Sequence, residues 1–133
     1  MTPLAAILRI RTHPCNPRLI SFCILLALAT PVWAHSTLDH SEPKNGVVLK
    51  QAPAEIRMWF TEPIKAGLST IEVRDSTGKQ VDKRDLHADE KTPALVHLSL
   101  LAGLAPGSYT VTWSAVAQDL HVGKGHLTFR IAP

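Results

Sequence analysis

The stretch SYTVTWSAV, residues 108–116, alternates apolar side chains with small polar ones at a period of two. Successive side chains of an extended strand point to opposite faces, so Tyr109, Val111 and Trp113 share one face. Threonine, valine and aromatic residues are also the types that strands favour. The stretch therefore predicts a β-strand with one face in the core and the other toward water.

The same alternation recurs in EIRMWF, residues 55–60, and in HLTFRI, residues 126–131. Weaker strand patterns occupy LSTIEVRD, ALVHLSL, STLDHS and GVVL, and turn signals such as EPKNG, QAPA, DSTGK and LAPGS separate them. No segment has a sustained helical period. Many short strands with regular turns predict an all-β fold, a single-domain antiparallel β-sandwich of the Greek-key type.

A tyrosine follows a turn in LAGLAPGSY, residues 101–109. In Greek-key sandwiches a tyrosine at such a corner can bond its hydroxyl to the backbone a few residues upstream. We therefore expect Tyr109 to form a tyrosine corner.

Residues 1–34 have the features of a secretory signal peptide: three arginines, the apolar run LISFCILLALA and the small-residue exit VWA. The run is too short to span a membrane, although an uncleaved anchor is the alternative. We expect cleavage after Ala34, an exported domain over residues 35–133, and no membrane insertion of the mature chain.

The expected mature chain has equal numbers of acidic and basic residues, because the three arginines of residues 1–34 account for the whole formal charge of +3. This balance gives no reason to expect a nucleic-acid partner. Both cysteines, Cys15 and Cys23, lie in the expected signal peptide. The mature domain must therefore be held by core packing without a disulfide.

Asp119 and His121 lie two residues apart in AQDLHVGKGH, so an extended backbone places both side chains on one face. The expected cleavage makes His35 the first residue, whose free amine and Nδ1 can close a chelate ring on a metal ion. These groups offer three nitrogens and one oxygen. In a tetragonal arrangement that donor set suits Cu(II), with tetrahedral Zn(II) as the competitor.

Four stretches of the chain carry a family resemblance: HSTLDHSEPKNG after the signal, APAEIRMWFTEPI, LAPGSYTVTWSAVAQDLHVGKG and the closing LTFRI. In these stretches the chain resembles the CopC/PcoC family of periplasmic copper-resistance proteins. The resemblance implies an immunoglobulin-like or cupredoxin-like Greek-key sandwich. It also implies one Cu(II) per chain, held by His35, Asp119 and His121. The chain is also similar to the family at a further glutamate, Glu62. We expect Glu62 either to orient a metal ligand or bind the metal weakly in an axial position, or to be a simple turn residue.

The chain departs from the family pattern at two places. Leu120 stands where the family commonly has glycine, and since leucine disfavours positive φ, we expect a different loop geometry. Some members carry a methionine-rich loop for Cu(I), whereas Met58 is the only methionine after residue 34. We therefore expect no methionine-based Cu(I) site. Among the remaining histidines, His126 is the best candidate for an extra ligand.

The leading hypothesis is a periplasmic, non-enzymatic copper protein that buffers or carries Cu(II). Its partners would be the copper ion and a membrane copper transporter or another periplasmic copper protein. One alternative is a copper-dependent oxidative enzyme with a histidine brace, like a lytic polysaccharide monooxygenase, although about 99 residues leave little room for a substrate face. The other alternative is a metal-free structural or adhesive sandwich.

Overall fold

The computed structural model describes residues 36–133, so the expected signal peptide and His35 lie outside the described residues. The described part has eight strands and a single turn of 3-10 helix. The strands are β1 (Leu38–Glu42), β2 (Val48–Leu49), β3 (Glu55–Phe60), β4 (Thr70–Asp75), β5 (His87–Ala88), β6 (Leu95–Ser99), β7 (Gly107–Val116) and β8 (Val122–Ile131), and the 3-10 turn is η1 (Ala66–Leu68). Within residues 36–133 no helix is long and apolar enough to cross a membrane.

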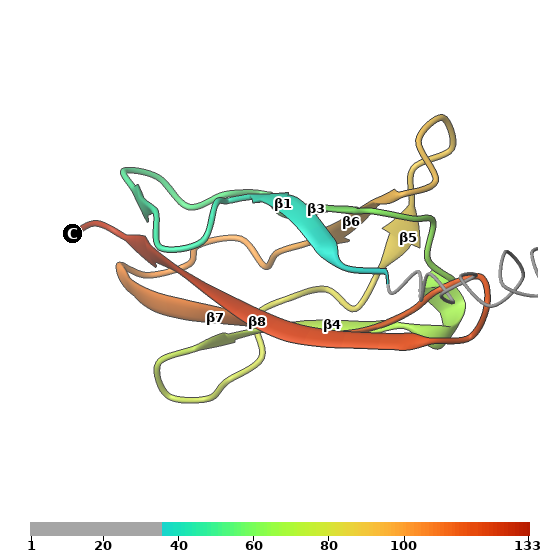
Figure 1. Cartoon of the computed structure of the whole chain (residues 1–133). Helices are drawn as coiled ribbons and strands as arrows, with labels where there is room; N and C mark the ends of the chain where they lie inside the picture. Colours follow the sequence, from blue (N-terminus) through green and yellow to red (C-terminus); the bar gives the residue numbers. More distant parts are fainter. Residues whose placement is uncertain (1–35) are drawn as a thin grey trace, which may run out of the picture. The chain divides into compact units, whose positions relative to one another are not determined.

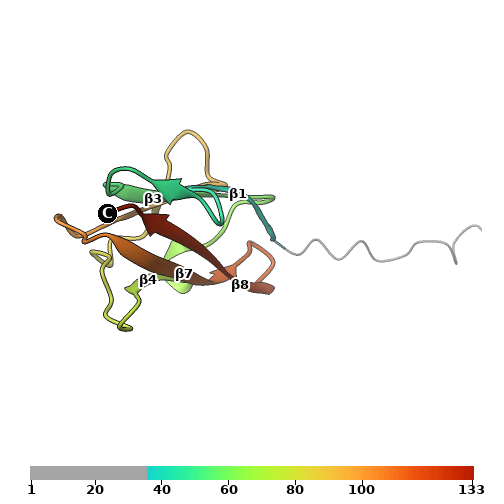
Figure 2. The ribbon, with the colours of Figure 1, turned by 90° about the vertical axis from the view of Figure 1, so that its left-hand side faces the viewer.

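The strands form two four-stranded sheets that face each other as two layers (Figures 1 and 2). One sheet has the order β1-β3-β6-β5 and the other has the order β2-β8-β7-β4. Every pair of neighbours is antiparallel except β2 and β8, which run parallel. The expected all-β sandwich is therefore confirmed, with one short parallel pair added to the antiparallel arrangement.

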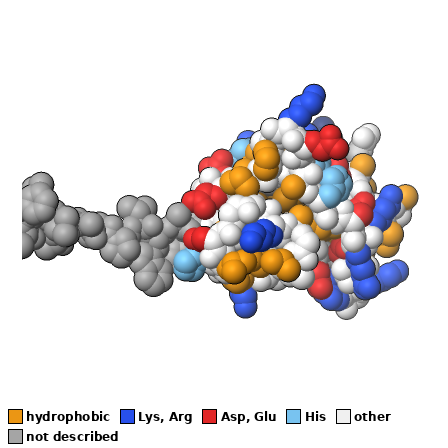
Figure 3. All heavy atoms as spheres, turned by 90° about the vertical axis from the view of Figure 1, so that its right-hand side faces the viewer, with side chains coloured by type: hydrophobic (Ala, Val, Ile, Leu, Met, Phe, Trp, Pro, Cys, Tyr) orange, Lys and Arg blue, Asp and Glu red, His pale blue; other side chains and the backbone are white. Residues whose placement is uncertain are grey.

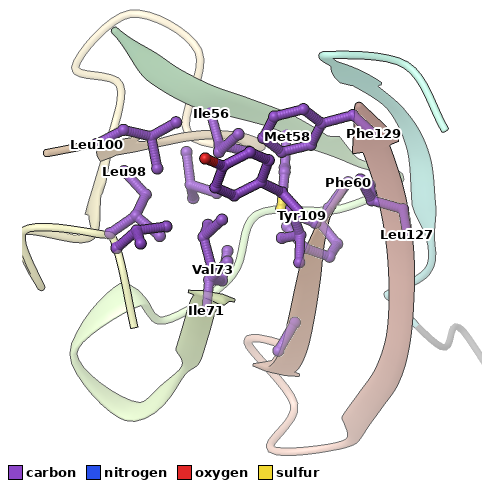
Figure 4. Close-up of a cluster of buried hydrophobic side chains, with 14 of the residues drawn as sticks. Ile56, Met58, Phe60, Ile71, Val73, Leu98, Leu100, Tyr109, Leu127 and Phe129 are labelled. Carbon is purple, nitrogen blue, oxygen red and sulfur yellow. The ribbon is translucent and has the colours of Figure 1, made fainter. Parts of the chain in front are cut away.

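The core lies between the two sheets and is built from the alternating residues that the strand patterns predicted. The labelled side chains in Figure 4 come from both layers and point into the space between them. Met58, in β3, has an exposed fraction of 0%. The fully buried or nearly buried set also includes Ile56, Phe60, Ile71, Val73, Leu98, Tyr109, Val111, Leu127, Phe129 and Ile131.

Trp113 is partly buried and packs against this core from β7. Its strand partner on β8 is Gly125. A Cβ atom added to Gly125 would lie 2.3 Å from Cζ2 of Trp113, so the indole ring uses the space that the glycine leaves. The prediction that Trp113 is a core residue is confirmed.

Tyr109 forms the expected tyrosine corner. Its hydroxyl donates a hydrogen bond of 2.6 Å to the carbonyl oxygen of Ala105, and its ring stacks on Phe129 at 5.3 Å between centroids. Burial raises the pKa of the Tyr109 hydroxyl, and the negative charge of Asp75 adds to the rise. The hydroxyl therefore stays protonated and available as a donor.

The loop between β7 and β8 is a tight hairpin turn. Ala117 N–H donates to the carbonyl of His121 at 2.9 Å, and Leu120 N–H donates to the carbonyl of Ala117 at 3.0 Å. A three-residue hairpin loop commonly needs a left-handed residue in its last position, and Leu120 supplies it with φ of 71°. The expectation that leucine would avoid positive φ is thus wrong at Leu120, because closing the hairpin outweighs the steric cost of about 1–2 kcal/mol.

Replacing Tyr109 with phenylalanine removes the corner hydrogen bond and keeps the ring in the core. We expect the free energy of unfolding to fall by about 0.5–1.5 kcal/mol, the net value of a typical intramolecular hydrogen bond. Urea titration followed by circular dichroism measures it. Thr110→Val, which removes an exposed hydroxyl from the next residue, should change the stability by less than about 0.5 kcal/mol. Equal stabilities of Tyr109→Phe and wild type would contradict a stabilising corner.

Replacing Leu120 with glycine should stabilise the domain, because glycine adopts positive φ without the steric cost of a side chain. The larger unfolded-state freedom of glycine offsets part of the gain, so we expect a net increase of up to about 1 kcal/mol. Leu120→Ala is the matched control, since it trims the exposed side chain and keeps the backbone strain. Thermal unfolding of the two variants decides the point. If the left-handed residue carried no strain, Leu120→Gly would melt below Leu120→Ala because of its larger unfolded-state freedom.

Candidate metal centre

Asp119 and His121 meet on the turn between β7 and β8. Nδ1 of His121 lies 2.8 Å from Oδ2 of Asp119, and the backbone N–H of His121 donates to Oδ1 of Asp119 at 3.1 Å. These bonds from His121, the side-chain bond first, hold the pKa of the Asp119 carboxyl below its usual range. Both side chains are about half exposed. The two side chains lie side by side as predicted, but on a hairpin turn with Leu120 at φ 71° and not on the extended backbone that the prediction assumed.

The spacing of these two atoms, 2.8 Å, is that of an ordinary hydrogen bond. An imidazole nitrogen and a carboxylate oxygen this close could serve as neighbouring ligands of one ion. The spacing does not distinguish a tetragonal ion from a tetrahedral one, whose ligand atoms would lie about 2.8 Å and about 3.3 Å apart.

The first described residues of the chain run directly beside this turn. Ser36 is only 2% exposed. A Cβ atom added to Gly123, two residues after His121, would lie 2.4 Å from the carbonyl oxygen of Ser36. His35 itself lies outside the described residues, but the residue that follows it lies against β8 next to the turn.

The chain after β3 borders the same segment from the other sheet. Thr37 N–H donates to Oγ1 of Thr61 at 3.1 Å, and Thr61 N–H donates to the carbonyl of Thr37 at 2.9 Å. Ser36 Oγ donates to the carbonyl of Glu62 at 3.4 Å. Glu62 therefore lies beside Ser36, and the contact there is through its backbone carbonyl.

His126 lies inside β8, paired with Thr112 and exposed, and does not open the strand as its place in the sequence suggested. Five residues of strand separate it from His121, a span of about 17 Å. That span is too long for both imidazoles to bind one ion.

Three more histidines lie on the outer face of the β1-β3-β6-β5 sheet. His40 stacks on Trp59 at 4.3 Å and its Nδ1 lies 2.7 Å from Oδ2 of Asp39. His97 faces out from β6, as its alternation with the buried Val96 and Leu98 predicts. His87 lies in the short strand β5, where it pairs with His97 and stacks on it at 5.4 Å.

Within residues 36–133 no group of three or more histidine, aspartate or glutamate side chains is arranged to hold a metal ion. Figure 3 views the end of the sandwich that lies at the right of Figure 1, where the β7–β8 turn is found. Acidic, basic, histidine and hydrophobic side chains are mixed on this face. No broad area of one charge sign covers the described part of it.

Two features of the centre escaped the sequence analysis. The first is the close approach of Gly123 to Ser36, and the second is the set of three hydrogen bonds between Thr37 and Thr61. Both contacts join residues far apart in the sequence, and no local sequence pattern indicates either of them. Only the packing of the two sheets brings them together.

Comparison with known proteins places the chain among copper proteins. It matches the CopC domain family over residues 38–132. It is 32% identical over 106 residues to Protein YobA of Escherichia coli strain K12, an alignment that spans 79% of this chain and 86% of YobA. It is 29% identical over 113 residues to copper transport protein CutJ of Bacillus subtilis strain 168, spanning 85% of this chain and 21% of CutJ.

Solved structures agree with the sequence relatives. CopC from Methylosinus trichosporium OB3b superposes with a TM-score of 0.69 at 27% identity, covering 74% of this chain and 95% of that protein. PcoC, a methionine-rich copper resistance protein from Escherichia coli, gives 0.65 at 25% identity, covering 74% and 99%. With its sandwich, its family match and its similarity to YobA in agreement, the chain belongs to the CopC family of copper-binding and copper-resistance proteins.

Proposed function

We propose that this protein binds one Cu(II) ion through His35, Asp119 and His121 and acts as a copper buffer or carrier in the periplasm. The observation that carries the proposal is the 2.8 Å pairing of His121 Nδ1 with Asp119 Oδ2, beside the chain segment that begins at Ser36. Consecutive Cα atoms are 3.8 Å apart, so the residue before Ser36 is within reach of the turn.

The proposed ligand set depends on processing of the N-terminus. Cleavage after Ala34 would free the amine of His35, which with its own Nδ1 forms a chelate that an internal histidine lacks. Asp119 and His121 would complete three nitrogen ligands and one oxygen ligand, the donor set that favours Cu(II). Glu62, next to Ser36, is the proposed group that orients the amine or an imidazole.

A carrier role requires no catalytic base and no substrate pocket, and we propose that the protein is not an enzyme. The relationship to CutJ supports a partner in copper transport. The aligned region is only 21% of that copper transport protein, so a domain similar to this chain is there joined to a much larger remainder. A membrane copper transporter or another periplasmic copper protein is the proposed recipient. Met58, the only methionine after residue 34, is enclosed in the core, which supports a Cu(II) site without a thioether Cu(I) site.

Adding one residue in front of His35 should weaken Cu(II) binding by more than about 100-fold. Loss of a group that only hydrogen-bonds to a metal ligand already costs about 10–100-fold in affinity, and here a ligand itself is lost. The test is a competitive Cu(II) titration of mature protein whose N-terminus is verified by mass, run beside the extended protein. His126→Ala is the control and should bind as wild type does. Equal binding by the native and extended proteins would remove the amine from the ligand set.

Lowering the pH from 8 to 5 should reduce the apparent Cu(II) affinity by more than about 100-fold. An α-amine has an unperturbed pKa of about 7.7–8.0 and an imidazole about 6.5, and both must lose a proton to bind copper. The Asp119 carboxyl, whose pKa is lowered by its bonds to His121, stays ionised over this range and adds nothing to the slope. Titrations at four pH values measure the effect, and a flat profile would contradict an amine and imidazole ligand set.

A further inference from the structure

We propose that Gly123 is a positioning residue for the N-terminal ligand: its missing side chain lets the chain at Ser36 lie against β8, beside the turn that carries Asp119 and His121. The inference rests on the proposed function, because it concerns how the amine of His35 reaches those two residues. It adds a residue that touches no ligand atom of the proposed site.

The contact between Gly123 and Ser36 leaves no room for a side chain. A Cβ atom on Gly123 would lie 2.4 Å from the carbonyl oxygen of Ser36 and 3.7 Å from its carbonyl carbon. The atom in the way belongs to the backbone, so no side-chain rotation relieves the overlap. Either β8 or the segment at Ser36 must move by about 1 Å to restore an ordinary contact.

The segment is also held on its other side, by residues that follow β3. Three hydrogen bonds join Thr37 to Thr61, and Ser36 Oγ donates to the carbonyl of Glu62. Ser36 is almost completely buried, with an exposed fraction of 2%. A displacement away from β8 therefore has to break the bonds to Thr61 or Glu62.

Such a displacement falls on the residue that precedes Ser36. Ligand groups of a metal site must be held to within about 0.5 Å of the productive geometry. A shift of about 1 Å at Ser36 exceeds that tolerance. The backbone bonds that close the turn join Ala117 to His121 and Leu120 to Ala117 and do not involve Ser36. We therefore expect Gly123 to act mainly on the amine, with the turn keeping its own shape.

The experiment compares Gly123→Ala with Gly67→Ala. Gly67 is the matched control, because a Cβ atom there would meet nothing within 4 Å and its φ is not in the left-handed region. We expect Gly123→Ala to weaken Cu(II) binding at least tenfold and to speed hydrogen exchange of the Thr37 and Thr61 amides in metal-free protein. Gly67→Ala should leave both quantities unchanged.

A thermodynamic cycle separates positioning from a general loss of structure. In protein with one extra residue before His35, Gly123→Ala should cause no further loss of copper affinity, since the amine is already misplaced. An equal loss with native and extended termini would overturn the proposal, and so would unchanged affinity with the native terminus.

Two further results keep the test decisive. If Gly123→Ala does not fold, Thr61→Val replaces it: the exposed Thr61 loses the hydroxyl that accepts from Thr37, and copper binding should weaken only with the native terminus. If native and extended wild type bind copper equally, the proposed function fails by itself. Hydrogen exchange of the Thr37 amide then decides whether Gly123 lets the chain at Ser36 pack against β8. Unchanged exchange in Gly123→Ala would overturn that packing role as well.

Discussion

The close packing of two sheets across one apolar layer is the constraint on which the other features depend. Residues 36–133 contain no cysteine, so the contacts among β3, β7 and β8 side chains have to hold the layers together without a covalent link. Met58 and Phe129 occupy the middle of this layer and are almost completely enclosed. Because such interiors are as dense as organic crystals, the ends of the strands are fixed relative to one another.

That rigidity brings three separate pieces of chain together at the candidate metal centre. The chain before β1, the chain after β3 and the turn between β7 and β8 meet at the same end of the sandwich. None of these three pieces of chain could fix the position of a ligand without the strands to which it is joined. Functional groups on loops gain their precision from the scaffold beneath them, and here both sheets contribute.

The sequence predicted those parts of the structure that are encoded locally. Period-two alternation located the long strands and their buried faces, and the turn before Tyr109 indicated its corner hydrogen bond. Asp119 and His121 were also predicted to have neighbouring side chains, and they do, although a turn and not an extended backbone brings them together. In each case the relevant physics involves residues close together in the chain, so the pattern was visible without a fold.

Other features depend on partners far apart in the chain, and there the sequence was silent or misleading. Leu120 adopts a conformation that its own steric preference opposes, because the hairpin around it requires one. His87 joins a sheet because β6 offers it an edge. Gly123 and Ser36 are in contact but lie near opposite ends of the domain's sequence, and nothing in the sequence around a glycine indicates such a contact.

The enclosure of Met58 has a consequence for chemical durability. Copper cycles between two oxidation states and can generate oxidants, whose preferred targets in proteins are thiols and thioethers. The described chain has no thiol, and its single thioether has no surface open to solvent. Conversion of Met58 to its sulfoxide would put a polar group in the middle of the core. The fold thus keeps its most oxidisable atom where a diffusing oxidant reaches it only when the domain opens.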